Sequence, residues 1–359
     1  MGACVFCIAA MLLVFTFLNS IDASRAPTVG RGRKQACDFY EGRWVFDNSY
    51  PLYDPRNCPF ILKEFNCQKN GRPDIDYLKY RWQPTRCNLP SWDGQAFLEK
   101  FRGRRIMFVG DSLGSNQWQS LTCMLHTAVP QAPYNLWRKG AVSTFAIPAH
   151  NISVMFLRNA LLVDVVNEGY ERVLKLDSIN GAKQWEGIDV LIFDSWHWWL
   201  HSGRKQPWDV MQVGNKTNNR LSRYEAYENA LKTWAGWVDT KVDTNKTKIF
   251  FQGVSPDHLK GTEWGKPDGS HCGGEEGPLL QATYPGGRHP AEGIVDKVLQ
   301  TMSKPVSLLR ITTLSQFRVD GHPSIYGNPR HIGMDCSHWC LAGVPDTWNV
   351  LLYASLIRR

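Results

Sequence analysis

The sequence predicts an α/β fold, in which helices cover both faces of a mostly parallel central sheet to form a three-layer sandwich. Two observations lead to this prediction. From residue 104 onward, short apolar runs alternate with segments of helical periodicity, as in a parallel sheet with crossover helices. The chain has 359 residues, of which 43% are hydrophobic, and this is enough to bury a substantial core.

Six apolar runs are the predicted strands: 106–109, 154–157, 161–166, 190–193, 249–251 and 308–311. Four segments are the predicted helices: 115–126, 223–238, 291–302 and 347–356. Apolar side chains recur at helical spacing from Tyr224 to Val238, which predicts a stripe that faces the core. Residues 201–220 and 255–290 are long, polar and rich in Gly and Pro, and loops of this length in a compact domain usually carry function.

Residues 1–23 have the features of a secretory signal peptide. An apolar run from Cys4 to Leu18 precedes the small residue Ala23. The run is shorter than the roughly 20 residues of a typical membrane span. We therefore expect cleavage and no membrane span in the mature protein; an uncleaved signal anchor that faces a lumen is the alternative. Residues 24–36 are polar and basic and are expected to be disordered.

Cysteine usage also indicates secretion. Cleavage after Ala23 leaves eight cysteines, an even number that predicts disulfides in an oxidising compartment. Four of them lie in residues 37–95, a loop-rich segment that we expect to form a disulfide-stapled cap on the main domain, 96–359. Three sequons predict N-glycosylation at Asn151, Asn215 and Asn245.

Charge and aromatic content narrow the class of partner. The formal net charge of +8 favours an acidic polymer such as a uronate-rich polysaccharide, or serves solubility alone. A secreted protein is not expected to bind nucleic acid. The 15 tryptophans are typical of proteins that stack on sugar rings, although tryptophans also fill cores.

The most informative motif is Gly110-Asp111-Ser112-Leu113. It follows the apolar run 106–109 and precedes the predicted helix 115–126, so it predicts a strand, a sharp turn and a helix. Ser112 would then lie at the carboxyl edge of the sheet, with its N–H at a helix N-terminus, where negative charge is favoured. These features suit a nucleophile whose intermediate is an oxyanion.

The matching base is predicted near the C-terminus. Asp335 and His338 are three residues apart, which places both side chains on the same face of a turn. His338 would take the proton of Ser112, and Asp335 would orient His338. The alternatives are that Ser112 only caps a helix, and that the pair Asp257 and His258 supplies the base instead.

Further candidates lie where the predicted strands end, because ligands of open α/β sheets bind outside the carboxyl ends of the strands. The candidate oxyanion and substrate contacts are Asn116, Gln117, Asp194, His197 and Trp198. Asp194 has an alternative interpretation as a buried carboxylate that caps backbone N–H groups. Trp198 has an alternative interpretation as a core residue. Cys336 and Cys340 flank His338 as metal ligands would, but no second close ligand pair accompanies them, and we expect no metal.

The chain resembles the plant trichome-birefringence-like family of polysaccharide O-acetyltransferases, whose catalytic domain is related to the SGNH/GDSL esterases. The matching motifs are 37–45 (CDFYEGRWV), 50–53 (YPLY), 58–61 (CPFI), 67–74 (CQKNGRPD), 82–84 (WQP), 108–113 (FVGDSL), 116–121 (NQWQSL) and 335–349 (DCSHWCLAGVPDTWN). The resemblance implies an SGNH/GDSL-like fold with Ser112 as nucleophile, His338 as base and Asp335 as its orienter. It also implies the disulfides Cys37–Cys87, Cys58–Cys123, Cys67–Cys340 and Cys272–Cys336.

The function that the resemblance implies is acetyl transfer. Ser112 would accept an acetyl group from a donor of unknown identity and pass it to a hydroxyl of a plant cell-wall polysaccharide, with no bound cofactor. Many relatives have Asn where this chain has Asp194, which bears on the choice between sugar and water as acceptor. The alternatives are a secreted acetylesterase, acting for instance on pectin, and a catalytically silent carbohydrate-binding protein. The expected location is the Golgi lumen or the extracellular space and cell wall.

Overall fold

A seven-stranded mixed sheet forms the centre of the fold. The computed structural model describes residues 37–218, 220–327 and 333–357, so the predicted signal peptide (1–23) and basic segment (24–36) lie outside the described residues. The strand order is β13-β12-β9-β3-β6-β5-β4. The strands are β3 (Arg105–Gly110), β4 (Asn135–Lys139), β5 (Val142–Ile147), β6 (Ile152–Arg158), β9 (Val190–Phe193), β12 (Lys248–Gln252) and β13 (Ser307–Leu309).

The central sheet contains both kinds of pairing. The neighbours from β13 through β12, β9 and β3 to β6 pair in parallel, whereas β5 and β4 add antiparallel at one edge. The carboxyl ends of the parallel strands therefore meet at one edge of the sheet. Sequence patterning missed β4 because all five of its side chains are exposed, so it has no alternating apolar face.

A second, four-stranded sheet was not predicted. It has the order β11-β10-β8-β7 and consists of β7 (Asp164–Glu168), β8 (Glu171–Lys175), β10 (Val210–Val213) and β11 (Lys216–Thr217). The predicted strand 161–166 is wrong at its start, because residues 161–163 are buried core residues that precede β7. The predicted strand 308–311 is wrong at its end, because Ile311 begins a helix.

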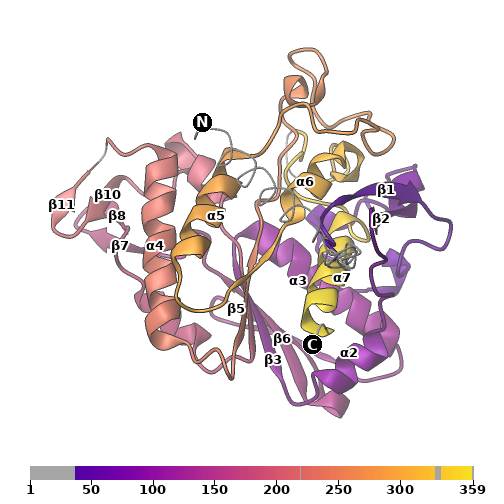
Figure 1. The fold of residues 1–359 in the computed structure, drawn as a ribbon, viewed down its shortest axis with the longest axis horizontal. Coiled ribbons are helices and arrows are strands. Elements are labelled where there is room, and N and C mark those ends of the chain that lie inside the picture. The colour runs from indigo at the N-terminus through magenta and orange to yellow at the C-terminus, as the bar shows by residue number, and fades with distance from the viewer. Residues whose placement is uncertain (1–36, 219, 328–332, 358–359) are drawn as a thin grey trace, which may run out of the picture. The chain divides into compact units, whose positions relative to one another are not determined.

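Helices cover both faces of the central sheet (Figure 1). Residues Met107 and Val109 of β3 share a core with α4 (Arg223–Lys241) and α5 (Pro290–Thr301). Their neighbours Ile106 and Phe108 face the opposite way, into a core with α3 and α7. The remaining helices and their bounds are α2 (Gly94–Lys100), α3 (Ser112–Ala128), α6 (Ile311–Gln316) and α7 (Val344–Ile357).

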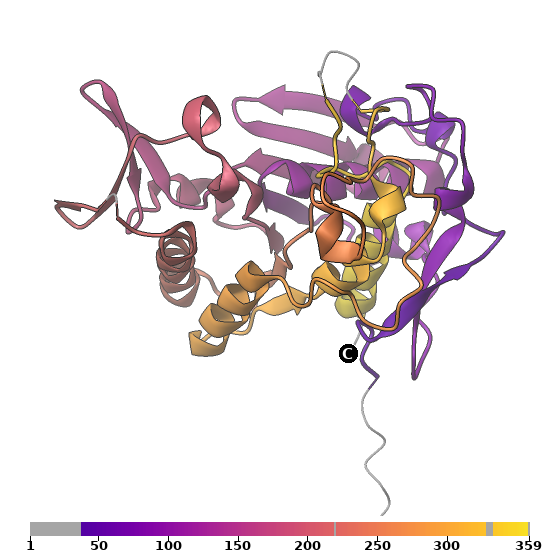
Figure 2. The same ribbon diagram turned by 90° about the horizontal axis from the view of Figure 1, so that it is seen from above.

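Local interactions determine where the helix α4 begins and which of its faces is buried. Ser222 and Glu225 form a capping box that satisfies the first N–H groups of the helix. The predicted apolar stripe is buried at Tyr227 and Trp234, but Tyr224 is 43% exposed and instead stacks on Trp196. An ion pair between Lys297 and Glu228, at 2.8 Å, joins α5 to α4, and the two helices lie side by side (Figure 2).

The N-terminal cap is built on β1 (Gly42–Phe46) and β2 (Tyr80–Pro84), which pair antiparallel. Short 3-10 helices occupy much of the segment between them. Disulfides tie the cap to the rest of the chain: Cys58–Cys123 reaches α3, and Cys67–Cys340 reaches the loop before α7. A third disulfide, Cys272–Cys336, joins two loops.

All four disulfides agree with the pairing that the resemblance implied, since Cys37 and Cys87 are disulfide-bonded as well. Cys336 and Cys340 therefore have no thiolate to offer a metal ion, which rules against the metal interpretation of that cluster. Within the part of the chain that the structure describes, no helix combines the length and the apolar character needed to cross a bilayer.

The disulfides lead to a stability prediction. Removing Cys67–Cys340, which spans 273 residues, through the double variant C67A/C340A should lower the free energy of unfolding by about 2–5 kcal/mol. The matched variant C58A/C123A opens a loop of 65 residues and should cost less, because a shorter loop restricts the unfolded chain less. Denaturant unfolding of the purified protein measures both changes, and equal or reversed costs would contradict this explanation.

Candidate active site

The nucleophile candidate Ser112 lies at the first position of α3, directly after β3 ends at Gly110. Asp111 between them is the N-cap, and its side chain accepts the N–H of Leu113 at 2.8 Å. The helix thus begins three residues earlier than the predicted 115, because Asp111 caps it. Ser112 stands at the carboxyl end of β3 and at the positive end of a 17-residue helix.

The turn is tight because a buried carboxyl group is packed inside it. Asp194 is 4% exposed, and its Oδ2 accepts the N–H of Asp111 at 3.1 Å. A Cβ atom added at Gly110 or Gly114 would lie 1.8 or 1.9 Å from Asp194 Oδ1. Both positions therefore require glycine so that Asp194 can reach the backbone of the turn.

Burial and the neighbouring charge of Asp111 raise the pKa of Asp194 well above its ordinary value. The contacts of Asp194 match its alternative interpretation as a buried carboxylate. Its side chain is enclosed by the turn, so it acts as the alternative interpretation proposed, by capping backbone N–H groups. The other oxygen of the Asp111 side chain accepts the N–H of His197 at 3.2 Å, which places the 3-10 helix His197–Leu200 beside the same turn.

The base candidate His338 contacts both Asp335 and Ser112, although Ser112 lies 226 residues earlier in the sequence. His338 Nε2 lies 2.7 Å from Ser112 Oγ, and His338 Nδ1 lies 2.8 Å from Asp335 Oδ2. The second oxygen of Asp335 accepts the N–H groups of Ser337 and His338, at 3.2 and 3.0 Å. The two predicted segments thus form one hydrogen-bonded chain from Asp335 through His338 to Ser112.

The electrostatics of this chain favour a basic imidazole. Burial disfavours the charged ring of His338, but the hydrogen bond and the negative charge of Asp335 outweigh burial and raise the pKa of His338 above 6.5. Burial also acts to raise the pKa of Asp335, yet the hydrogen bonds and the charge of His338 lower it well below 3.8. Both shifts favour a carboxylate beside an imidazole that readily accepts a proton.

Asn116 holds the loop of His338 against α3. Its Oδ1 accepts the N–H of Trp339 at 2.8 Å, and its Nδ2 donates to the carbonyl of Trp339 at 3.2 Å. Asn116 is fully buried, and both polar atoms of its side chain bond to the backbone of Trp339, so the contacts in the structure are with this loop. It lies one helical turn after Ser112 on the same face, and this spacing of four was the available signal for a supporting role.

Gln117 is also fully buried, which excludes it as a substrate contact. One residue beyond Asn116, the helix has turned by about 100°, so Gln117 points away from Ser112. Its backbone carbonyl accepts from Asn349 of α7 at 3.0 Å, which places it at the interface between α3 and α7.

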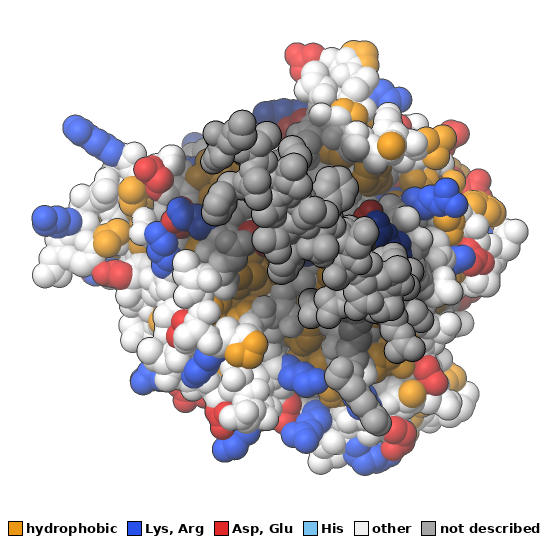
Figure 3. Space-filling model, in the orientation of Figure 1, with side chains coloured by type: hydrophobic (Ala, Val, Ile, Leu, Met, Phe, Trp, Pro, Cys, Tyr) orange, Lys and Arg blue, Asp and Glu red, His pale blue; other side chains and the backbone are white. Residues whose placement is uncertain are grey.

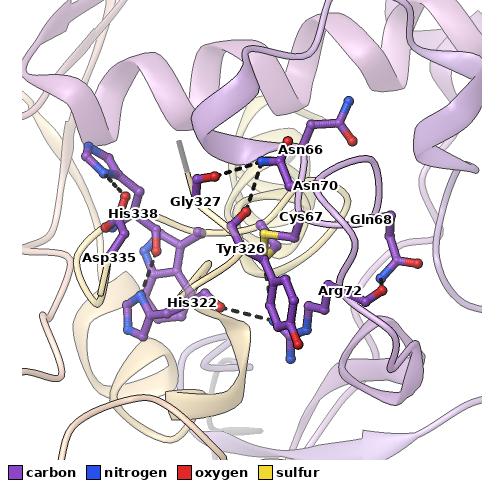
Figure 4. The surroundings of a disulfide bond; sticks show 12 residues. Asn66, Cys67, Gln68, Asn70, Arg72, His322, Tyr326, Gly327, Asp335 and His338 are labelled. Carbon is purple, nitrogen blue, oxygen red and sulfur yellow. Dashed lines mark hydrogen bonds and ion pairs between the residues drawn. A yellow bond between two sulfur atoms is a disulfide. The ribbon is translucent and has the colours of Figure 1, made fainter. Parts of the chain in front are cut away.

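The cap supports the same loop from the other side (Figure 4). Asn70 donates to the carbonyls of Tyr326 and Gly327, and Arg72 donates to the carbonyl of His322 at 3.0 Å. The segment that they hold pairs with Asp335, because the backbones of Ser324 and Asp335 exchange two hydrogen bonds. Sequence reasoning missed these cap residues, since nothing in their spacing indicates which distant carbonyl they reach.

Comparison with known proteins shows the family to which the chain belongs. Residues 89–355 match the family described as "GDSL/SGNH-like Acyl-Esterase family found in Pmr5 and Cas1p", and residues 35–88 match the "PMR5 N terminal Domain". Trichome birefringence-like 43 of Arabidopsis thaliana is 51% identical over 351 residues, 96% of this chain and 95% of the relative. The chain belongs to this GDSL/SGNH-like, trichome-birefringence-like family. Trichome birefringence-like 41 and 42 of the same plant are 52% and 50% identical, over 90% and 97% of this chain and 91% and 97% of their own lengths.

Two of the predicted contacts of this trichome-birefringence-like chain remain at the surface of the site. His197 is half-buried, and its Nε2 lies 2.9 Å from the carbonyl of Ser255. Trp198 is half-buried beneath the guanidinium of Arg158, 4.9 Å from the ring centroid, whereas its neighbour Trp199 is fully buried. His197 and Trp198 are thus the predicted residues that a bound sugar could still touch.

The alternative pair, Asp257 and His258, does not lie where it could take the proton of Ser112. His258 is fully buried, and both of its ring nitrogens face other protein atoms, His322 Nε2 and the carbonyl of Gln316. Neither nitrogen is directed at Ser112. The base assignment therefore rests on His338.

The turn around Asp194 yields a paired prediction. Gly114→Ala should lower the free energy of unfolding by about 1–3 kcal/mol, because its methyl group would overlap Asp194 and force the turn open. Gly236→Ala is the matched control, since it is an exposed glycine inside α4 with no atom near the added methyl group, and it should stabilise the helix by up to about 1 kcal/mol. Thermal unfolding compares the two variants; a tolerated Gly114→Ala would contradict the enclosed position of Asp194.

Proposed function

We propose that this protein is a polysaccharide O-acetyltransferase that works through an acetyl-serine intermediate on Ser112. The observation that carries the proposal is the hydrogen-bonded chain in which His338 Nε2 lies 2.7 Å from Ser112 Oγ and Asp335 lies 2.8 Å from His338 Nδ1. Membership of the acyl-esterase family supports ester chemistry at this serine. The names of the Arabidopsis relatives support the plant context.

The first half-reaction loads the serine. His338 takes the hydroxyl proton as Ser112 Oγ attacks the carbonyl carbon of the acetyl donor, and the donor oxygen becomes an oxyanion. The N–H of Ser112 and the positive end of α3 are the groups that we propose stabilise this charge. When the tetrahedral intermediate collapses, His338 gives the proton to the departing group, and acetyl-Ser112 remains.

The second half-reaction repeats these steps with a sugar hydroxyl as nucleophile. His338 removes the proton of the hydroxyl, the hydroxyl oxygen attacks acetyl-Ser112, and His338 returns the proton to Ser112 Oγ. His197 and Trp198 are the proposed acceptor contacts, because an imidazole can bond sugar hydroxyls and an indole face packs against a sugar ring. Asp335 remains a carboxylate throughout and stabilises the charged imidazole.

The setting that we propose is the secretory pathway, in the Golgi lumen or the cell wall. The disulfides suit an oxidising compartment, and the three sequon residues, Asn151, Asn215 and Asn245, are all exposed and accessible to glycosylation. A cell-wall polysaccharide is the proposed acceptor, with acidic pectin as one example. On the face drawn in Figure 3, Lys and Arg are interspersed with Asp and Glu, so the visible charge there is not gathered into one patch.

Acetylesterase activity is the second candidate, and one observation favours it. The side chains of His338 and Asp335 are 25% and 22% exposed, so water can approach the reacting serine unless a bound polysaccharide displaces it. With water in place of the sugar hydroxyl, the same steps remove acetyl groups.

Two incubations separate these functions. Purified protein is given an acetyl donor with a deacetylated polysaccharide, and separately an acetylated polysaccharide in water. Gain of acetyl groups on the polymer identifies a transferase, and loss in the second reaction identifies an esterase. Ser112→Ala should reduce either activity to background with an unchanged thermal midpoint, because only the nucleophilic oxygen is lost. Polysaccharide binding with neither reaction, or full activity in Ser112→Ala, would refute the proposal.

The raised pKa of His338 fixes the direction of the pH dependence. The base must be neutral to accept a proton, so kcat/KM should fall as the pH drops through the pKa of His338, with a midpoint above 6.5. Asp335→Asn removes the carboxylate that raises this pKa, and should move the midpoint to lower pH while reducing the rate by about four orders of magnitude. A wild-type midpoint at or below 6.5 would contradict this assignment.

A further inference from the structure

Two buried histidines lie directly behind the loop of His338. His258 is fully buried in the loop after β12, and His322 is 1% exposed just after the 3-10 helix Val319–Gly321. His258 Nδ1 lies 2.6 Å from His322 Nε2. The two outer nitrogens face backbone carbonyls. His258 Nε2 lies 3.0 Å from Gln316 O. His322 Nδ1 lies 2.6 Å from His338 O (Figure 4).

The number of protons on the two rings limits how many of these contacts can be hydrogen bonds. A carbonyl oxygen only accepts, so each outer nitrogen needs a proton to form its hydrogen bond, and the inner contact needs a third. Two neutral imidazoles carry two N–H protons between them. Two of the three contacts can therefore be hydrogen bonds while the pair is neutral, and a third requires one ring to become charged.

The rings are neutral in neutral solution. Burial lowers the pKa of His258 to about 4, and burial followed by the charge of His258 lowers the pKa of His322 well below 6.5. The groups that act in the opposite direction are the charges of Asp257 and Asp335, together with the carbonyl contacts, and His338 adds a further unfavourable charge. Arg72 donates to the carbonyl of His322 rather than to its ring.

All three contacts lie within hydrogen-bond distance, but two facing lone pairs repel most strongly where the atoms are closest, so the two shortest contacts need a proton first. The contact to Gln316 is the longest of the three, at 3.0 Å, whereas the other two measure 2.6 Å. In the matching arrangement, His258 donates from Nδ1 to His322 Nε2, and His322 donates from Nδ1 to the carbonyl of His338. His258 Nε2 then carries the lone pair.

Neighbouring contacts hold both rings in place. His322 stacks on Trp339, with ring centroids 4.1 Å apart, and His258 packs edge-on against Trp264. The backbone of His258 bonds to Cys336 and Cys272, the two halves of one disulfide. The chain of donors therefore ends on the backbone of the same residue whose ring faces Ser112.

We propose that His258 and His322 are positioning residues for His338: His258 sets the tautomer in which His322 donates to the His338 carbonyl, and this bond holds the His338 ring in line with Ser112 and Asp335. This role rests on the proposed function, in which His338 is the base. Neither ring touches the reacting atoms, so both act through the orientation of His338.

Kinetic variants of the full secreted chain test this role with the acetyl substrates used above. His322→Phe keeps a flat ring on Trp339 but removes the donor, and should lower kcat roughly tenfold or more with little change in KM. His322→Asn places an amide N–H near the position of Nδ1, and should recover most of that loss. His126→Phe is the control, since His126 lies in the last turn of α3 outside the site and should leave kcat unchanged.

The tautomer of His322 is a readout that would not change if His258 served only to fill space. Nitrogen-15 spectra of histidine-labelled protein at neutral pH should show His322 protonated at Nδ1 and bare at Nε2, and His258→Phe should allow the other tautomer of His322. His322 protonated at Nε2 in the wild type would overturn the proposal. So would wild-type kcat in a folded His322→Phe variant, provided that Ser112→Ala is inactive. An active Ser112→Ala would instead refute the proposed function itself.

Discussion

The hydrogen bond between His338 and Ser112 is the interaction on which the rest of the site depends, and its two partners are held very differently. Ser112 is fixed by regular structure, because it stands between a central strand and a long helix. His338 lies in a loop that has almost no regular structure of its own. Its position must therefore be imposed by neighbouring elements, through hydrogen bonds and disulfides.

Support for the loop comes from four directions. Asn116 of α3 holds Trp339, the disulfide to Cys67 holds Cys340, and the disulfide to Cys272 holds Cys336. His322 contacts the carbonyl of His338 itself. A general base has to be aligned to within a fraction of an ångström, and several weak constraints from different elements achieve this better than a single strong one. The N-terminal cap thus helps to hold the proposed base in place, although Ser112 and His338 belong to the larger domain.

The sequence was informative where the chemistry is local. Gly110 to Leu113 predicted a strand, turn and helix, and Asp335 and His338 predicted a shared turn, because each arrangement involves residues only a few positions apart. For Asp194 the sequence offered backbone capping only as an alternative and did not indicate which N–H groups it caps, since that depends on a neighbouring strand that delivers the carboxyl group into the turn. The same holds for Asn116, whose partner lies 223 residues away. β4 escaped prediction for a different reason, because a fully exposed edge strand has no buried face to create a pattern.

The separation of Cys67 and Cys340 has a consequence for how the enzyme is made. Cys67 leaves the ribosome early, and Cys340 follows only 273 residues later, close to the end of the chain. Cys67 must wait through the synthesis of these 273 residues for its covalent partner, while Cys58 and its partner Cys123 are already available to form a disulfide. The Cys67–Cys340 bond therefore cannot form until residue 340 has been made, so Ser112 is synthesised long before the loop of His338 can be held in place.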